Sequence, residues 1–224
     1  MKINVMDKLL SANDAWAEEN RLLLRKHGIT MLNIIGSPGA GKTTLLEQTI
    51  ALLGKTIKMA VIEGDIATTK DAARIEKMGV AAYQINTGNA CHLDAHLVNT
   101  ALKELINDVN PELIFVENIG NLVCPAEFDI GEDGKIAVLS VTEGDDKVEK
   151  YPLLFSEAEI LVITKLKLIE HTNFNLAIAL AAFKQLNKKG EVITVDSCSG
   201  EGFASWIDFV QDCVLVHKIA ECFK

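Results

Sequence analysis

The feature of this sequence that most constrains its fold is a glycine-rich segment at residues 36–43, which reads Gly-Ser-Pro-Gly-Ala-Gly-Lys-Thr. It matches the pattern G-x-x-x-x-G-K-[ST], whose glycines let backbone N–H groups close around phosphate oxygens. The apolar run before it, residues 31–35, predicts a buried strand, and residues 44–53 after it predict a helix. Because this pattern requires a strand before it and a helix after it, the segment predicts nucleoside triphosphate binding.

Each part of the segment has an expected role. Lys42 is expected to reach the β and γ phosphates, where it would also be catalytic, and the Thr43 hydroxyl is expected to bind Mg²⁺. Backbone groups at the start of the helix are expected to hold the other phosphate oxygens, because the helix dipole favours negative charge there. The predicted phosphate-binding residues are Gly36, Ser37, Pro38, Gly39, Ala40, Gly41, Lys42, Thr43 and Thr44.

Composition narrows the class of protein. The 224 residues are 49% hydrophobic and 24% charged, which predicts a globular α/β chain with a proper core. No apolar run approaches the ~18–20 residues that span a bilayer, and the N-terminus lacks signal-peptide architecture, so we expect a cytoplasmic enzyme without membrane contact. A net charge of −9 argues against a nucleic-acid partner. Five cysteines, an odd number, indicate metal ligands, catalytic thiols or buried side chains rather than a disulfide framework.

Strands and helices are predicted to alternate after the phosphate loop. The expected strands are 57–63, 80–85, 112–117, 136–142, 159–164 and 191–195, and the expected helices are 69–78, 92–108, 173–188 and 202–222. The continuous apolar strands favour a mainly parallel central sheet covered by helices on both faces, a three-layer α/β sandwich. We expect residues 1–28, with a helix at 5–26, to pack on or extend from a nucleotide-binding domain of residues 29–224. Residues 125–135 are predicted to form the longest loop.

Carboxylates follow two of the predicted strands, at the edge where an open parallel sheet binds ligands. Asp65 ends the second strand and Glu117 the fourth, and either oxygen donor suits Mg²⁺. Glu117 is also a candidate for aligning groups near the γ-phosphate, with the Gly120 N–H closing on that phosphate. Asp71 is a candidate for orienting the attacking water, and an alternative interpretation is a first-turn helix aspartate favoured by the dipole.

A second group of residues has metal-binding chemistry. Cys91 and His92 are adjacent, and Cys124 lies four residues beyond Gly120. A thiolate–imidazole set suits Zn²⁺, Ni²⁺ or Cu ions, although lone cysteines are more often buried apolar residues. Three ligands leave a site incomplete, and a two-fold dimer would bring a second set. His96, one helical turn after His92, is a further candidate, whereas Cys198, Cys213 and Cys222 have no ligand neighbour, and the last two are expected in the core.

Over nearly its whole length, the sequence resembles the HypB family of hydrogenase nickel-incorporation GTPases, which belong to the SIMIBI class of phosphate-loop GTPases. The runs that carry the resemblance are 36–44, 63–65 (Glu-Gly-Asp), 84–88 (Gln-Ile-Asn-Thr-Gly), 91–96 (Cys-His-Leu-Asp-Ala-His), 117–126 (Glu-Asn-Ile-Gly-Asn-Leu-Val-Cys-Pro-Ala) and 140–147 (Ser-Val-Thr-Glu-Gly-Asp-Asp-Lys). The resemblance implies a GTP-dependent homodimer that handles Ni²⁺ for nickel–iron hydrogenase, with the chaperone HypA and the hydrogenase large subunit as partners. It implies that Cys91, His92 and Cys124 form a metal site at the dimer interface that also takes Zn²⁺, and that Asp71 lies in a switch loop.

The chain departs from the resemblance at the base-recognition motif. The family and most GTPases carry Asn-Lys-x-Asp, where the Asp accepts hydrogen bonds from guanine, but this chain has Thr-Lys-Leu-Lys at residues 164–167. Lys165 can still stack its stem on the base and Thr164 can make one polar contact, but Lys167 offers donors only. Losing a charge-assisted hydrogen bond, worth about 1.5–3 kcal/mol, would lower guanine selectivity by roughly one to two orders of magnitude. Glu170 or a backbone carbonyl is a candidate substitute, and Ser197 and Cys198, after the last strand, are expected beside the base.

Two other functions remain as alternatives. An ATPase or small-molecule kinase would share the phosphate loop, although the chain has only three arginines with which to build a substrate lid. A metal-binding scaffold that senses nucleotide without hydrolysing it is the non-enzymatic alternative. The residues for hydrolysis are intact, which favours a slow GTPase that acts as a nickel metallochaperone and switch.

Overall fold

The computed structural model describes residues 5–65, 70–88 and 90–222 of this chain. Seven parallel strands form one sheet in the order β3-β2-β4-β1-β5-β6-β7. Their bounds are β1 Thr30–Gly36, β2 Met59–Asp65, β3 Ala81–Asn86, β4 Leu113–Glu117, β5 Gly134–Ser140, β6 Ile160–Thr164 and β7 Glu191–Thr194. The order reverses direction on either side of β1, so the turn after β1 lies where ligands bind in such sheets.

The central strands are apolar on both faces because helices cover both. Every residue of β1, β4 and β6 is buried. Alternate side chains of β4 divide between two cores, with Phe115 packing on one face and Ile114 on the other. Strands of this kind read as continuous apolar runs rather than alternating ones, as the sequence predicts.

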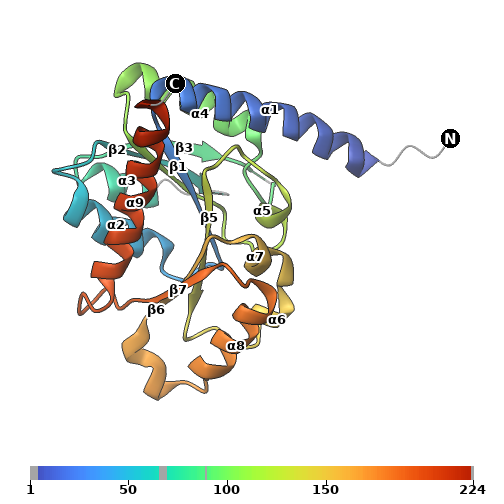
Figure 1. The fold of residues 1–224 in the computed structure, drawn as a ribbon, viewed down its shortest axis with the longest axis vertical. Helices are drawn as coiled ribbons and strands as arrows, with labels where there is room; N and C mark the ends of the chain where they lie inside the picture. The colour runs from blue at the N-terminus through green and yellow to red at the C-terminus, as the bar shows by residue number, and fades with distance from the viewer. Residues whose placement is uncertain (1–4, 66–69, 89, 223–224) are drawn as a thin grey trace.

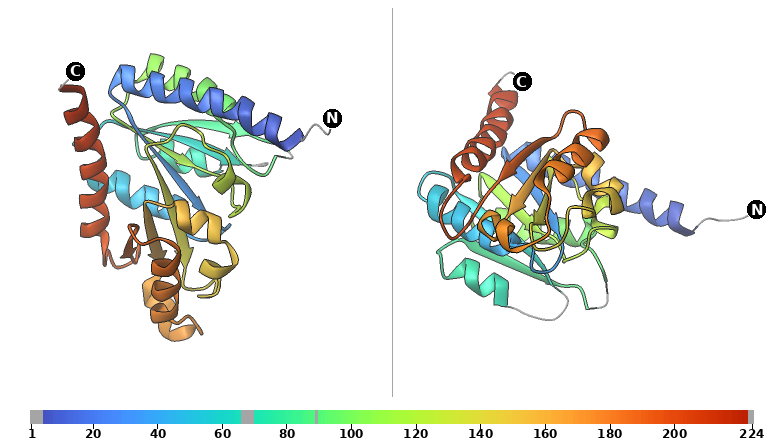
Figure 2. Two further views of the ribbon diagram at one scale, coloured as in Figure 1. Left: turned by 45° about the vertical axis from the view of Figure 1, so that its right-hand side comes forward. Right: turned by 90° about the horizontal axis from the view of Figure 1, so that it is seen from below.

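Helices form the two outer layers (Figures 1 and 2). One face is covered by α2 (Lys42–Leu53), α3 (Lys70–Glu76) and α9 (Phe203–Cys222). The other carries α1 (Val5–His27) and α4 (Ala95–Asp108) over one half, and α5 (Cys124–Glu127), α6 (Lys147–Lys150), α7 (Pro152–Glu157) and α8 (Leu176–Leu186) over the other. Within the described ranges, no helix is both long and apolar enough to cross a bilayer.

Helix α1 lies along α4, as both figures show (Figures 1 and 2). The contact is polar and buried at its centre: Asn20 is 0% exposed, and its Nδ2 donates to the carbonyls of Ala95 (2.8 Å) and Ile130 (2.9 Å). Asn99 of α4 returns a hydrogen bond to the Asn20 Oδ1 (2.8 Å). These bonds fix the position of α1, because moving the helix would leave the buried Asn20 amide without its partners, which costs free energy.

The three-layer parallel α/β sandwich expected from the sequence is confirmed, and the predicted strands differ from the observed ones by a few residues at most. The predicted helix 92–108 begins at Ala95 instead, because Asp94 is extended and its carboxylate caps the Leu97 N–H at 2.8 Å. The predicted loop 125–135 contains part of α5 and the first residues of β5. Three short helices, α6, α7 and the 3₁₀ helix η1 (Leu166–His171), had no counterpart in the prediction, because one turn is too short for helical periodicity to show.

Helix α9 is anchored by Trp206, which is fully buried and donates its Nε1–H to the Thr49 hydroxyl of α2 at 2.8 Å. We expect Trp206→Ala to lower the free energy of unfolding by about 3–5 kcal/mol, because it leaves a large cavity between α9 and the sheet. Trp206→Phe should cost less, since the ring is largely retained. Urea denaturation of both variants, with Leu215→Ala as a control at a residue 54% exposed on the same helix, checks this; equal costs for Trp206→Ala and Leu215→Ala would contradict it.

Candidate functional site

The glycine-rich segment forms the turn between β1 and α2, as its sequence requires. Gly39 (φ 77°) and Gly41 (φ 95°) adopt left-handed conformations that other residues rarely tolerate. A Cβ on Gly36 would lie 2.7 Å from the Val138 carbonyl oxygen, so only glycine lets β1 pass β5 at this point. The helix that follows starts at Lys42, which leaves the backbone N–H groups of its first turn directed at the concave side of the loop.

The side chain of Lys42 lies inside this loop. Its ammonium group donates to the carbonyl oxygens of Gly36 (3.1 Å) and Ser37 (3.3 Å), and the residue is only 6% exposed. A second lysine approaches from α6, where the Lys147 ammonium donates to the Ser37 hydroxyl at 3.1 Å. A third lysine, Lys165, contacts the Gly39 carbonyl, so three cations converge on the loop and supply the positive charge that a polyphosphate requires.

Two glutamates lie side by side at the carboxyl ends of β2 and β4. Glu63 and Glu117 are register partners on adjacent strands, and they are 3% and 6% exposed. The Thr43 hydroxyl donates to Glu117 Oε1 at 2.9 Å. Burial, and after it the neighbouring Glu117 carboxyl, raises the pKa of Glu63 to about 10, and burial also raises the pKa of Glu117.

This corner of the pocket fits a hard divalent cation. Glu63 Oε1 and Glu117 Oε2 are buried oxygen atoms without a hydrogen-bond partner among the described residues, next to the Thr43 hydroxyl. With a pKa of about 10, Glu63 is protonated beside Glu117 at neutral pH. A cation bound here would favour the ionised form of both groups, and Mg²⁺ prefers oxygen ligands. Asp65 also lines this pocket. The residues of this pocket that could hold a divalent cation are Thr43, Asp65 and Glu117, which the sequence analysis named, together with Glu63.

Asp71 lies on the rim of the same pocket, in the first turn of α3. Its carboxylate pairs with Arg74 at 2.9 Å, and Arg74 also binds Glu47 of α2 at 2.6 Å. Both sequence interpretations of Asp71, as a water-orienting group and as a first-turn helix residue, are compatible with this position. Residues 66–69, just before Asp71 in the switch loop that the resemblance implies, lie outside the described residues. They include Thr69, the predicted start of this helix.

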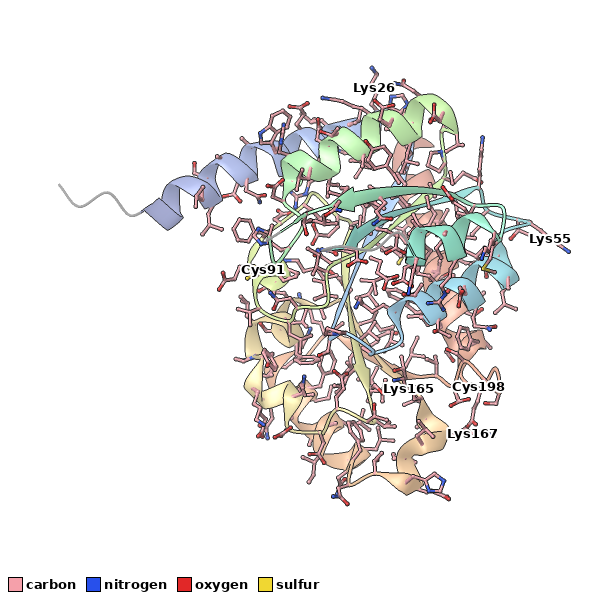
Figure 3. The ribbon with its side chains drawn as sticks, turned by 180° about the vertical axis from the view of Figure 1, so that it is seen from behind. Lys26, Lys55, Cys91, Lys165, Lys167 and Cys198 are labelled. Atoms are coloured by element: carbon pink, nitrogen blue, oxygen red, sulfur yellow. The ribbon has the colours of Figure 1, made fainter. Side chains whose placement is uncertain are left out.

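A second cavity of about 460 Å³ adjoins the phosphate loop beyond the ends of β6 and β7. Thr164, at its wall, donates from Oγ1 to the Ala40 carbonyl at 2.6 Å and so ties β6 to the phosphate loop. Lys165 extends across to the Gly39 carbonyl at 2.6 Å, which lays its stem over the cavity. Figure 3 shows Lys165, Lys167 and Cys198 at this end of the molecule, away from Cys91. Ser197 and Cys198, which the sequence analysis expects beside the base, line this cavity, whereas Glu170 is exposed and is not among its lining residues.

The three predicted metal ligands are brought together. Cys91 Sγ lies 2.9 Å from Cys124 Sγ and 3.6 Å from His92 Nδ1, and one donor atom from each of these residues lies within 4.8 Å of the others. Cys91 is exposed, and the other two are partly exposed. Burial against Phe128, whose ring centroid is 3.9 Å away, lowers the pKa of His92 and favours the neutral, ligating form. The contact with Cys91 raises the pKa of Cys124.

The other cysteines and His96 lie elsewhere. His96 packs its ring on Trp16 of α1, with centroids 4.7 Å apart, and is not among the grouped ligands. Cys213 is half-buried against the core, and burial raises the pKa of its thiol to about 11, so it is an inert packing residue. The side chain of Cys222, predicted to lie in the core, is outside the described residues.

Three contacts join the cysteine–histidine cluster to the carboxylate corner. Asn118, directly after Glu117, accepts the Leu93 N–H at 3.3 Å, and the Asn121 amide donates to the Cys91 carbonyl at 3.2 Å. A Cβ on Gly64 would lie 2.8 Å from the Leu93 side chain, so the segment after the ligands packs directly on β2. Gly120 approaches the phosphate loop equally closely, since its Cβ would lie 2.6 Å from Pro38. The segments that carry the two sites therefore pack directly against each other.

Comparison with known proteins decides the family. Residues 30–194 match the family model described as "CobW/HypB/UreG, nucleotide-binding domain". The hydrogenase maturation factor HypB of Azotobacter vinelandii is 47% identical over 209 residues, which cover 93% of this chain and 69% of that protein. The chain belongs to the HypB family of hydrogenase maturation factors.

Solved HypB structures share the fold. HypB from Archaeoglobus fulgidus is 40% identical, with a TM-score of 0.86 over 92% of this chain and 100% of that one. HypB from Helicobacter pylori, whose structure was determined in complex with nickel, is 36% identical, with a TM-score of 0.87 over 91% of this chain and 95% of that one.

Relative to the sequence prediction, the structure of this HypB family member adds three pocket residues. Glu63 stands two residues before the predicted ligand Asp65, and the Glu-Gly-Asp run alone does not say which carboxylate points inward. Arg74 lines the phosphate pocket through its place on α3. Asp196 lines the second cavity. The available signal for Asp196 was a charged residue directly after an apolar strand, the same signal that selected Asp65 and Glu117.

Proposed function

We propose that this chain is a GTP-hydrolysing nickel metallochaperone and switch, which serves nickel–iron hydrogenase maturation. The observation that carries the proposal is the pair of sites joined by Asn118 and Gly64: a cation-lined phosphate pocket and a thiol–imidazole cluster. The HypB structure solved with nickel supports the choice of cargo.

In the nucleotide pocket, Lys42 and the α2 N-terminus would bind the triphosphate. Thr43, Asp65 and Glu117, with Glu63 beside them, would hold Mg²⁺, which would neutralise phosphate charge. Asp71 at the rim is positioned to orient the attacking water for displacement at the γ-phosphate. The predicted nucleotide contacts of Gly120, Thr164, Lys165, Ser197 and Cys198 all line one of the two adjoining cavities.

Nickel is the cargo of the cluster rather than a resident cofactor. Cys91, His92 and Cys124 supply three donors, and sets of this type take Ni²⁺ or Zn²⁺. The cluster is partly exposed, and the apolar Val123 beside Cys124 is 48% exposed. A second copy of the chain completes the coordination and covers this apolar side chain, so the proposed working form is a homodimer with a shared metal site. HypA and the hydrogenase large subunit are the proposed partners in transfer.

The switch predicts that nucleotide state changes nickel affinity. We expect the Ni²⁺ dissociation constants of the forms bound to a non-hydrolysable GTP analogue and to GDP to differ by about 5- to 150-fold, the usual range of coupling between sites. Competition with a metal indicator dye measures both constants. Equal affinities in the two forms would remove the switch and leave a nucleotide-binding metal protein.

The same measurement on two asparagine variants locates the coupling. Asn118→Ala removes the acceptor of the Leu93 N–H, so the ratio of the two nickel affinities should move towards one. Asn173→Ala alters an exposed asparagine outside both sites and should keep the wild-type ratio.

A further inference from the structure

The cavity beside the phosphate loop contains a carboxylate that the base-recognition motif does not supply. Beyond the phosphate loop itself, its walls come from the ends of β6 and β7 and the segments that follow them. Among the described residues that line it, Asp196 is the single acidic one. Its neighbour across the cavity wall is Lys167, which stands where most GTPases have the aspartate that reads guanine.

The Asp196 side chain is held in one orientation. It is 4% exposed, its Oδ1 accepts from the Ser199 N–H (3.0 Å) and hydroxyl (3.1 Å), and its Oδ2 accepts from the Lys167 N–H (3.2 Å). Its backbone N–H also donates to the Glu201 carbonyl, which closes the loop around it. Burial acts to raise the pKa of Asp196, but the hydrogen bonds from Lys167 and Ser199 outweigh it and hold the pKa below its ordinary value, so the group is an anion.

This carboxylate keeps acceptor capacity. An ionised carboxylate accepts about four hydrogen bonds, two on each oxygen. Oδ1 accepts two and Oδ2 accepts one of the bonds named above, so Oδ2 can accept a further donor.

Lys167 contributes to the cavity in a different way. Its side chain is exposed, and its backbone N–H is the group that positions Asp196. An ammonium group offers donors only and cannot accept from the N1–H and exocyclic amine of guanine. Lys167, at the motif position, therefore cannot accept hydrogen bonds from guanine. Asp196, which the Lys167 backbone contacts, can accept them.

We propose that Asp196, rather than residue 167, is the specificity-determining residue for the nucleobase, and that the base it selects is guanine. The inference rests on the proposed nucleotide-binding function. Guanine can donate its 2-amine to the remaining acceptor position on Oδ2, whereas adenine has no donor at position 2 and presents the acceptor N1 at that edge. Beside adenine this acceptor position stays unfilled in a buried site and faces another acceptor, and this penalty produces the selectivity.

The test begins with the wild-type protein and needs no variant. Dissociation constants for GDP, IDP, XDP and ADP are measured by calorimetry with Mg²⁺ present. GDP should bind more tightly than IDP, which lacks the 2-amine, and about 10- to 100-fold more tightly than ADP or XDP. Comparable affinities for GDP and XDP would overturn the inference, because a carboxylate cannot pair with the xanthine 2-carbonyl.

The variant arm is a gain of binding, which misfolding cannot produce. Asp196→Asn replaces Oδ2 with an amide donor that matches the xanthine 2-carbonyl and gives up the bond from the Lys167 N–H, so the XDP-to-GDP preference should shift towards XDP by at least about 10-fold. Lys167→Ala keeps the backbone N–H and should leave the GDP-to-XDP ratio within about threefold.

An unchanged ratio in Asp196→Asn, or a shift in Lys167→Ala instead, would assign base selection elsewhere and overturn the inference while nucleotide binding stands. Wild-type protein that binds none of the four nucleotides would instead overturn the proposed function itself. The two failures are therefore distinguishable in one set of titrations.

Discussion

Lys42→Ala is expected to reduce GTP hydrolysis by about 10²–10³-fold, the cost of removing one preorganised charge from the reacting phosphate. Lys42 is buried within the phosphate loop, where its ammonium group is held by the Gly36 and Ser37 carbonyls. Charge developing on the γ-phosphate oxygens in the transition state meets this ammonium group in a pocket of low dielectric, so its contribution exceeds that of a surface lysine.

Steady-state phosphate release under saturating GTP measures the effect. The control is Lys55→Ala, since Lys55 lies just beyond the end of α2, outside the pocket, and is exposed. Near-equal rates for Lys42→Ala and wild type would show that the phosphates bind elsewhere. Loss of rate in both variants would point to destabilised protein, which a thermal unfolding measurement would detect.

Cys91→Ser is expected to weaken Ni²⁺ binding by more than about 100-fold. Changes at groups that only support metal ligands cost about 10- to 100-fold, and removing a ligand costs more. Serine keeps the size of the side chain, but its hydroxyl is not deprotonated at neutral pH and is a harder donor than a thiolate. The variant would keep only two of the three donors, Cys124 Sγ and His92 Nδ1, both of which lie close to the Cys91 position.

Equilibrium dialysis against Ni²⁺ without nucleotide measures this affinity. Cys198→Ser is the matched control, because Cys198 is equally exposed but lies beside the second cavity rather than in the cluster. Unchanged nickel binding in Cys91→Ser would place the metal site outside this cluster, and equal losses in the two variants would show that the thiols act non-specifically.

Those parts of the site that lie close together in the sequence could be predicted from the sequence. Gly39 and Gly41 adopt left-handed backbone conformations that glycine allows locally, so this part of the phosphate loop is readable from the sequence. The need for glycine at position 36 comes instead from the nearby Val138 carbonyl of β5. The parallel sheet could be predicted because strands covered by helices on both faces appear in the sequence as continuous apolar runs. Asp65 and Glu117 were found because each directly follows such a strand, and the order of strands in an open sheet brings their ends together.

The grouping of Cys91, His92 and Cys124 was only partly accessible to sequence reasoning. Adjacent Cys and His are a recognisable ligand pair in the sequence, but Cys124 joins them only in three dimensions. Cys91 and His92 follow β3, and Cys124 follows β4. The segment after β3 packs on Gly64 of β2, the strand between them, and so reaches Cys124. His96, which helical spacing placed on the same side, turns instead to Trp16 because α1 packs against α4. Packing between elements distant in the sequence decided which histidine belongs to the cluster.

The sequence by itself determined the fold class, the phosphate loop and the residues with metal-binding chemistry, since these depend on residue type and local spacing. Only the tertiary structure decided which side chains meet across strands. Glu63 faces Glu117 through the register of β2 and β4, and Asp196 meets Lys167 across 29 positions of chain. The physical reason is that backbone conformation is set by neighbours along the chain, whereas hydrogen bonds and burial depend on position in three dimensions.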